Sequence, residues 1–179
     1  MDYKLLYEDN HLLVVVKPSN IPVQEDRSGD LDLLSILKND IKVRFNKPGN
    51  VFLGLVHRLD RPVGGVMVFA KTSKAASRLS AQIREHRMEK SYFCVVHGCP
   101  EKLSGKLTDF LLKNTKTNTV KVVTPNTAGA KEAILKYEVL EHVEGLSLIK
   151  IDLLTGRSHQ IRVQMAHNGT PLYGDSKYG

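Results

Sequence analysis

Residues 134–153 of the chain, ILKYEVLEHVEGLSLIKIDL, decide the fold class. Two apolar-rich runs, Ile134–Leu140 and Leu146–Leu153, are separated by the polar stretch Glu141–Gly145, which predicts a turn. Runs joined by so few residues favour antiparallel hairpins. Strands of the same kind are predicted earlier in the chain at Tyr92–Val96, Leu107–Leu112 and Val120–Val123.

The N-terminal part of the chain adds further strands. Leu5–Tyr7 and Leu12–Val16 predict a hairpin, which Lys17-Pro18 ends. Val51–Val56 is almost wholly apolar, as expected of a central strand that is covered on both faces. Val66–Ala70 predicts one more strand, so the β-structure extends over both halves of the chain.

Helices are predicted between these strands. Apolar residues at helical spacing follow Asp30, a suitable N-cap, as far as Ile41. Thr72 or Ser73 begins a second helix, which extends to about His86. The inward stripe of that second helix is predicted to be Ala76, Leu79 and Ile83.

A short basic helix is predicted last, from Ser158 to a stop at Gly169. Together the elements predict an α+β fold, a large mixed but mostly antiparallel β-sheet flanked by a few helices. The 179 residues, 41% of them apolar, are enough for one domain and few for two, so we expect a single domain over residues 1–179.

Composition excludes several protein classes. The longest apolar run, Leu12–Val16, is far shorter than the roughly 20 residues of a membrane-spanning helix, so no membrane partner is expected. The first residues lack the pattern of an export signal, which makes the cytoplasm the expected compartment. Cys94 and Cys99 have a spacing that suits neither a redox pair nor structural zinc, so we expect reduced thiols.

The charge balance points toward a polyanionic partner. Lysine plus arginine number 26 and aspartate plus glutamate 19, which gives a net charge of +7. With no tryptophan and 6% aromatic residues, a broad platform for stacking bases is not expected. Recognition of backbone charge fits this composition better.

Polar residues interrupt the apolar background in three segments, His57–Asp60, Lys90–Tyr92 and Gly156–Arg162, each at a strand end or helix start. Side chains at such positions can project into a shared cleft. An ionised carboxylate at Asp60 could act as a nucleophile or a base. From spacing alone, a loop aspartate in a surface ion pair is the commoner explanation.

The other two segments also allow two interpretations each. Arg157, His159 and Arg162 surround a helix start and could bind a phosphate or a carboxylate, or form a solvated basic face. Tyr92 could stack on a base or assist a proton transfer, or belong to the core. His159 and His167 are two helical turns apart, too far to share a metal, so no metal site is predicted.

Taken together, the polar segments and their flanks resemble the RluA-type family of RNA pseudouridine synthases over most of the chain. His57–Asp60 is similar to the family's catalytic loop, and Thr155–Arg162 to a later motif. The remaining similar segments are Leu6–Asp9 with Leu12–Pro18, Lys90–Tyr92 with Val95–Gly98, and Gly174-Asp175 with Tyr178-Gly179.

The resemblance implies an isomerase that converts selected uridines of ribosomal or transfer RNA to pseudouridine without a metal or organic cofactor. It implies that Asp60 is the essential carboxylate, either nucleophile or base, and that Arg162 keeps it ionised. Tyr92 would pack on the uracil, and Arg58 would help to hold the target nucleotide outside the stack. The further RNA-binding candidates are His57, Arg157, His159 and Lys90.

Two departures from the family pattern keep an alternative open. Val63 stands where the family usually has threonine, so a hydroxyl that could lock the loop is lost, and members normally continue for several strands beyond the position of Gly179. The alternative is a non-catalytic RNA-binding or ribosome-assembly factor on the same fold. A metal-dependent nuclease is set aside because no carboxylate cluster suits magnesium. We expect a monomer, and a C-terminal tail could be missing.

Overall fold

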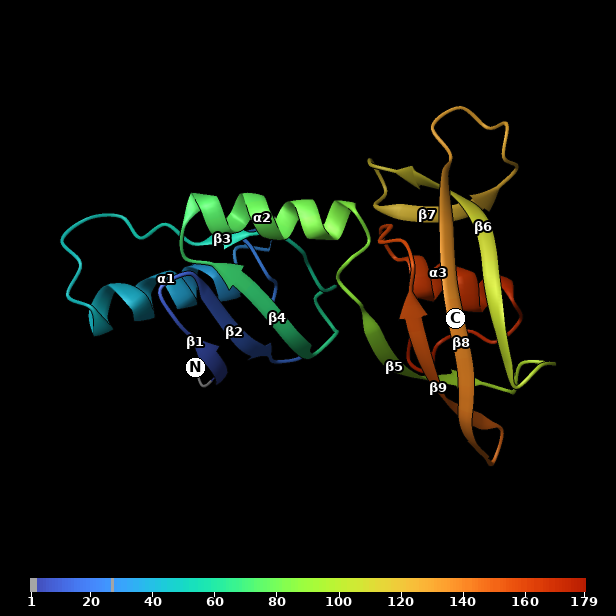
Figure 1. Cartoon of the computed structure of the whole chain (residues 1–179). Helices are drawn as coiled ribbons and strands as arrows, with labels where there is room; N and C mark the ends of the chain where they lie inside the picture. The colour runs from blue at the N-terminus through green and yellow to red at the C-terminus, as the bar shows by residue number, and fades with distance from the viewer. Residues whose placement is uncertain (1–2, 27) are drawn as a thin grey trace. The chain divides into compact units, whose positions relative to one another are not determined.

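The structure, a computed structural model, describes residues 3–26 and 28–179 (Figure 1). It forms two compact units, Met1–Arg87 and Met88–Gly179, each built on its own antiparallel sheet. The predicted α+β class with flanking helices is confirmed, and the strands are divided between a four-stranded and a five-stranded sheet. The expectation of one catalytic domain over the whole chain stays a prediction.

The sheet of the first unit has the order β1-β2-β4-β3. The predicted hairpin forms as β1 (Lys4–Glu8) and β2 (Leu12–Lys17), and β4 (Gly65–Ala70) pairs antiparallel with β2. The prediction of a central strand at Val51–Val56 is wrong. Only β3 (Gly54–Leu55) pairs, at the sheet edge, because this apolar run is not covered throughout: Phe52 is 53% exposed.

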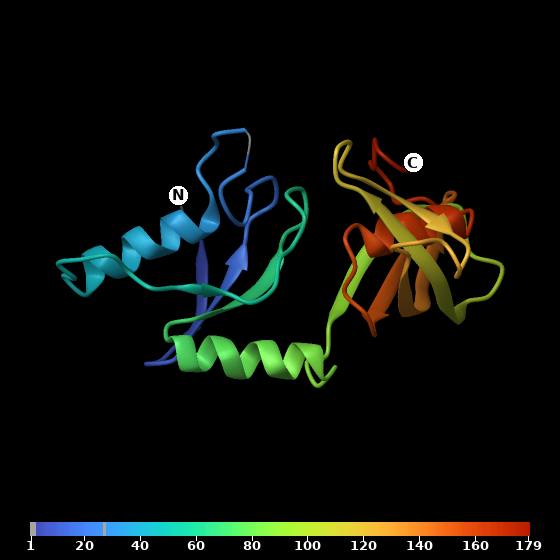
Figure 2. The ribbon, with the colours of Figure 1, turned by 90° about the horizontal axis from the view of Figure 1, so that it is seen from above.

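Two helices pack on this sheet, on opposite sides of it, as Figure 2 shows. α1 (Leu33–Arg44) buries an apolar stripe against alternate residues of β2 and β4. Its N-cap is Asp32, whose carboxylate accepts a hydrogen bond from Ser35 N, so the predicted cap at Asp30 is wrong by two residues. The core of the first unit includes Leu33, Leu37, Ile41, Leu13, Val15, Met67 and Phe69.

α2 (Ser73–Arg84) follows β4 and is capped by Thr72, as predicted. The hydroxyl of Thr72 accepts a hydrogen bond from Ala75 N at 3.1 Å. Ala75 is the buried residue of this helix, whereas the predicted stripe of Ala76, Leu79 and Ile83 is half-buried. Its arginines and lysine lie on the exposed side.

The second unit carries the sheet β5-β9-β8-β6-β7. The stretch that decided the fold class forms a long hairpin, β8 (Lys131–Val143) and β9 (Leu146–Leu153), with Glu144 and Gly145 at positive φ in a two-residue turn. The other predicted strands also form, with slightly wider bounds. They are β5 (Ser91–His97), β6 (Ser104–Asn114) and β7 (Thr119–Val123).

α3 (Gln160–His167) packs on one face of this second sheet. It begins two residues later than predicted, because the side chain of Gln160 organises the preceding turn, and Gly169 at φ 82° follows its C-cap as expected. The chain then returns to β5, where His97 N donates to Pro171 O and Tyr173 N to Val95 O. Within residues 3–26 and 28–179, no helix is long and apolar enough to cross a membrane.

Candidate active site

Asp60 lies in the loop between β3 and β4, and its side chain is half-buried. The loop turns directly after it, because Val63 N donates a hydrogen bond to Asp60 O at 3.0 Å. This bond uses only the backbone, so the turn closes without the hydroxyl that the family pattern has at position 63.

The side chain of Lys17, at the end of β2, is hydrogen-bonded to this loop. Its ammonium donates to Pro18 O at 2.9 Å, to Ile21 O at 2.7 Å and to Arg61 O at 3.0 Å. The residue is 0% exposed, so the three carbonyls replace its hydration. Burial, and then the charge of Arg61, lower the pKa of Lys17, while the negative charge of Asp60 opposes that shift.

The same loop approaches the chain after Lys17 closely. A Cβ atom added to Gly64 would lie 3.0 Å from Ser19 Oγ and 3.4 Å from Lys17 O, tighter than ordinary contact. Gly65 follows with φ at 150°, a conformation that residues with a side chain rarely adopt. The paired glycines therefore let the loop lie against the segment that Lys17 anchors.

The neighbours of Asp60 have distinct environments. His57 is half-buried, and its Nε2 accepts a hydrogen bond from Val68 N at 3.1 Å, which fixes the ring on β4. Arg58 is exposed. Arg61 forms an ion pair with Asp30, with Nη2 2.5 Å from Oδ2. It therefore links the Asp60 loop to the polar loop before α1. Arg27 of that polar loop lies outside the described residues.

In the second unit, Arg162 on α3 is paired with Asp175. Arg162 Nε donates to Oδ2 at 2.7 Å and Nη2 to Oδ1 at 2.6 Å, a bidentate geometry. The two side chains are 18% and 4% exposed. The hydrogen bonds from Arg162 hold the pKa of Asp175 below its usual range, although burial opposes this.

Tyr178 lies beside this pair. Its ring centroid is 5.1 Å from the Arg162 guanidinium carbon, a cation–π distance. Its hydroxyl accepts a hydrogen bond from Val120 N at 2.9 Å and lies 2.6 Å from His159 Nδ1. His159 precedes α3 with φ at 51°, in the left-handed region. Arg162 and His159 are thus both tied to the segment after α3.

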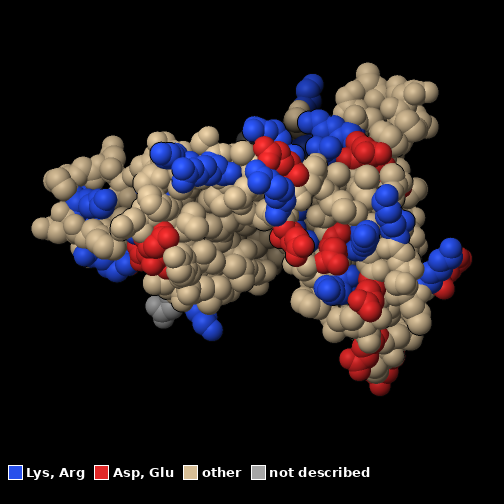
Figure 3. Space-filling view, viewed as in Figure 1, with Lys and Arg blue, Asp and Glu red and all other residues tan. Residues whose placement is uncertain are grey.

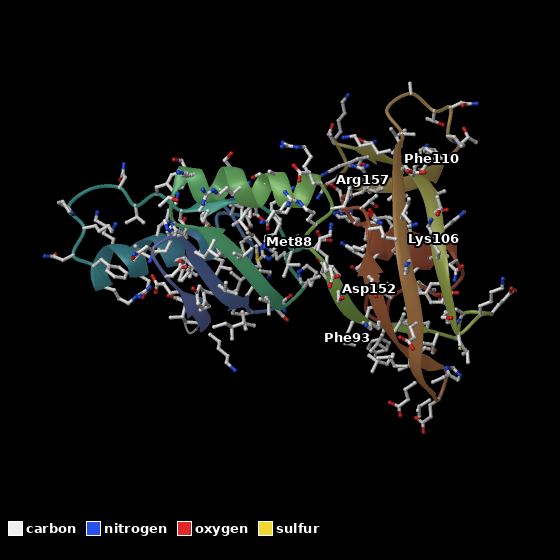
Figure 4. All side chains as sticks on the ribbon, in the orientation of Figure 1. Met88, Phe93, Lys106, Phe110, Asp152 and Arg157 are labelled. Carbon is white, nitrogen blue, oxygen red and sulfur yellow. The ribbon has the colours of Figure 1, made fainter. Side chains whose placement is uncertain are left out.

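The turn before α3 is organised by Gln160, which is buried. Its Oε1 accepts hydrogen bonds from Thr155 Oγ1 and from Arg157 N, both at 2.9 Å, and its Nε2 donates to Ile134 O. Arg157, labelled in Figure 4, donates from Nε to Glu132 O on β8 at 2.8 Å, which ties its exposed side chain to the start of that strand. Arg157 therefore projects from a fixed turn.

Lys90 and Tyr92 lie at the start of β5. Tyr92 is half-buried and packs against the core cluster that includes Met165 of α3. Burial lowers the pKa of Lys90. Lys90 O accepts a hydrogen bond from Leu153 N at 2.9 Å, so the backbone here is held by β9.

Each unit therefore brings together one part of the predicted site. The first holds His57, Arg58 and Asp60 on one loop, and the second holds Arg157, His159 and Arg162 around the start of α3. Sequence reasoning missed the positions of Lys17 and Asp175 in these clusters. The signal for Lys17 was a charged residue in phase with buried Leu13 and Val15 of the same strand.

Comparison with known proteins identifies relatives of this arrangement. The family model described as RNA pseudouridylate synthase matches residues 11–167. The ribosomal large subunit pseudouridine synthase C of Buchnera aphidicola subsp. Baizongia pistaciae is 35% identical over 175 residues, covering 98% of this chain and 53% of the relative. The synthase of the same name from Vibrio parahaemolyticus is 34% identical over 179 residues, covering 100% of this chain and 54% of the relative.

A solved structure supports the same relationship. The human protein described as RNA pseudouridylate synthase domain containing 4 matches with a TM-score of 0.84 and 25% identity, covering 98% of this chain and 69% of that chain. The chain spans about half the length of the curated relatives it matches.

Proposed function

Because the chain belongs to the RNA pseudouridylate synthase family, we propose that it isomerises uridine to pseudouridine in RNA. The match over residues 11–167 carries this proposal, since it includes both the Asp60 loop and the segment around Arg162. Ribosomal RNA is the proposed substrate because the similar curated proteins are named for the large ribosomal subunit. Transfer RNA is the second candidate, and the cytoplasm is the proposed compartment.

The proposed reaction rearranges one nucleotide. The bond between N1 of uracil and C1′ of the ribose breaks, the freed uracil rotates, and its C5 bonds to C1′. C5 then loses its proton, and N1 gains one. We propose that Asp60 starts this sequence, either by attacking the nucleotide as a nucleophile or by removing a proton from the sugar.

Asp60 must be ionised for either role. We propose that the guanidinium of Arg162 is its charge partner, since a carboxylate removed from water without a cation tends to bind a proton. The bidentate bond to Asp175 supports a fixed guanidinium, and the bond from Lys17 Nζ to Arg61 O supports a fixed loop backbone next to Asp60. Catalysis benefits when such groups are positioned before substrate binds.

The remaining candidates are proposed to bind RNA. Arg58 is exposed next to Asp60, as a residue that holds an unstacked nucleotide would be. Tyr92 would pack on the uracil and help to deprotonate C5. Contacts to the surrounding RNA are assigned to His57, Lys90, Arg157 and His159.

Release of tritium from RNA labelled at C5 of uridine tests this function. We expect release by the wild-type chain, complete loss with Asp60→Asn, and little change with Asp152→Asn, which makes the same chemical change at an exposed position of β9. RNA affinity of Asp60→Asn should stay near wild type, because phosphate contacts dominate such interfaces. RNA binding without any tritium release would favour the non-catalytic RNA-binding or ribosome-assembly factor.

A further inference from the structure

A basic pocket lies in the second unit, and neither Arg162 nor Asp175 lines it. It has a volume of about 380 Å³ and is formed by the end of the β6–β7 hairpin, the start of β8 and the turn before α3. Figure 3 shows lysine and arginine side chains near this end of the hairpin, with acidic side chains beside them. Its charged residues are Lys113, Lys131 and Arg157.

Strand register places the two lysines on one face of the sheet. Lys113 pairs with Val120, and Lys131 pairs with Leu111. Directly paired residues share a face, as do residues two apart on one strand. Leu111 and Val120 are 3% and 6% exposed and form the apolar floor, so both lysines stand at the rim of the same pocket with their ammonium groups in solvent.

Arg157 completes the rim from a turn that is already fixed. Its backbone N–H is bound by Gln160, and its Nε is bound by Glu132 O, so binding a ligand requires little further ordering of this side chain. Ser158 and Thr115 add hydroxyl groups to the lining. The pocket therefore offers hydrogen-bond donors from three separate segments of the chain.

The charge of this pocket is one-sided. Three cations line it, and none of its lining residues is an aspartate or glutamate. Like charges held in one pocket repel each other, and an anion among them relieves that repulsion. Lysine and arginine side chains, together with hydroxyls, are the usual partners of phosphate oxygens in protein–nucleic acid interfaces.

We propose that this pocket binds a phosphodiester group of the RNA substrate, outside the nucleotide that reacts. The choice of RNA as the carrier of the phosphate rests on the proposed function, whereas the anion site rests on the pocket itself. A contact of this kind positions the RNA without reading its sequence. It should therefore contribute to RNA affinity and leave the chemical step unchanged.

The salt dependence of RNA binding tests this assignment. The full chain and the double variant Lys113→Ala/Lys131→Ala are titrated with a transcript of large-subunit ribosomal RNA over a range of KCl concentrations. A lost phosphate contact reduces the slope of log affinity against log salt by about 0.7 to 0.9, so the double variant, which removes two of the three cations around one phosphodiester, should lose up to that amount. With that loss of slope, the affinity of the double variant should fall about 5- to 8-fold less than that of the wild type for each tenfold rise in salt.

Matched variants separate the pocket from general charge. Lys121→Ala/Lys136→Ala removes two exposed lysines from β7 and β8 that do not line the pocket, and should keep the wild-type slope. Lys113→Arg/Lys131→Arg keeps the charges and should also keep it. Equal slopes for the pocket variant and the wild type, or equal losses in the pocket and control variants, would overturn the assignment.

Pseudouridine formation by the same proteins distinguishes this inference from the proposed function. We expect the pocket variant to show a raised KM and an unchanged kcat. A wild-type chain that forms no pseudouridine, yet loses slope with the pocket variant, would refute the proposed function and leave the pocket assigned. Inorganic phosphate is the second probe: if it binds here tightly and RNA does not displace it, the site takes a small anion and the RNA assignment is wrong.

Discussion

The carboxylate of Asp175 holds the guanidinium of Arg162 through two hydrogen bonds, 2.7 Å to Nε and 2.6 Å to Nη2. A planar guanidinium bound at two of its nitrogens cannot rotate without breaking both bonds. The side chain of Asp175 is almost fully buried, so little water competes for the hydrogen bonds of the pair. Asp175 therefore determines the direction in which Arg162 presents its remaining N–H groups.

Replacing Asp175 with asparagine should slow catalysis more than it weakens RNA binding. The amide cannot accept two charge-assisted bonds, so the guanidinium is held less firmly. If this costs about 1.5–3 kcal/mol of transition-state stabilisation, kcat falls about 10- to 100-fold. Steady-state kinetics of pseudouridine formation give kcat and KM separately. Asp175→Glu, which keeps the charge, should recover part of kcat, and a KM effect alone would contradict this positioning role.

Replacing Lys17 with methionine should destabilise the first unit. The methionine has a similar length but donates no hydrogen bonds, and each buried carbonyl left unsatisfied costs about 1–3 kcal/mol. Urea unfolding of the full chain measures the change. Lys4→Met alters an exposed lysine on the neighbouring strand β1 and should unfold like the wild type. Similar stabilities for both variants would show that the Lys17 bonds contribute nothing net.

Stability in acid should depend on Glu8. Burial alone would raise the pKa of Glu8, but hydrogen bonds from Arg44 and Lys71 outweigh it and hold the pKa below the ordinary 4.5. The unfolded chain then binds this proton more readily, so the contribution is present above about pH 4.5 and is lost as pH falls through the lower folded pKa. Glu8→Gln should flatten the acid limb of the stability–pH curve.

The control for this pH dependence is Glu25→Gln, which makes the same change in the exposed loop before α1. Its stability–pH curve should follow the wild type. Parallel curves for wild type and Glu8→Gln between about pH 3 and pH 6 would contradict the linkage expected from a lowered pKa.

The contributions of the Tyr178 hydroxyl and of its ring can be measured separately. Tyr178→Phe removes the acceptor of the Val120 N–H and should cost about 1–3 kcal/mol in the stability of the second unit, measured by thermal unfolding. The ring under Arg162 remains, so kcat should change little. Tyr178→Leu also removes the ring, and should lower kcat further than Tyr178→Phe does.

The strands of the second unit could be predicted from sequence because each alternates and is bounded by turn residues, as in Leu146–Leu153. The division into two sheets could not, since alternation indicates which residues share a face and not which strands pair. The apolar run Val51–Val56 misled for the same reason: coverage on both faces depends on distant elements. The N-cap of α1 was predicted at Asp30 and lies at Asp32, because both residues satisfy the local capping preference.

For the site too, the sequence indicated residues in local motifs and did not indicate the partners that the fold brings to them. The motifs indicated Asp60 and Arg162, but they did not indicate Lys17 as a support for the loop. A lysine that ends a strand usually faces solvent, and only the carbonyls of Ile21 and Arg61, brought in by the fold, explain its burial. The sequence likewise did not indicate that Asp175, in the segment after α3, would bind Arg162.

The return of the chain to β5 has a consequence for solubility at high protein concentration. Pro171–Tyr173 occupies backbone groups of Val95–His97 that would otherwise recruit a strand from another molecule. The opposite border of the sheet, β7, is five residues long and carries the charged Lys121. Both borders thus carry features that oppose the addition of a strand from another molecule.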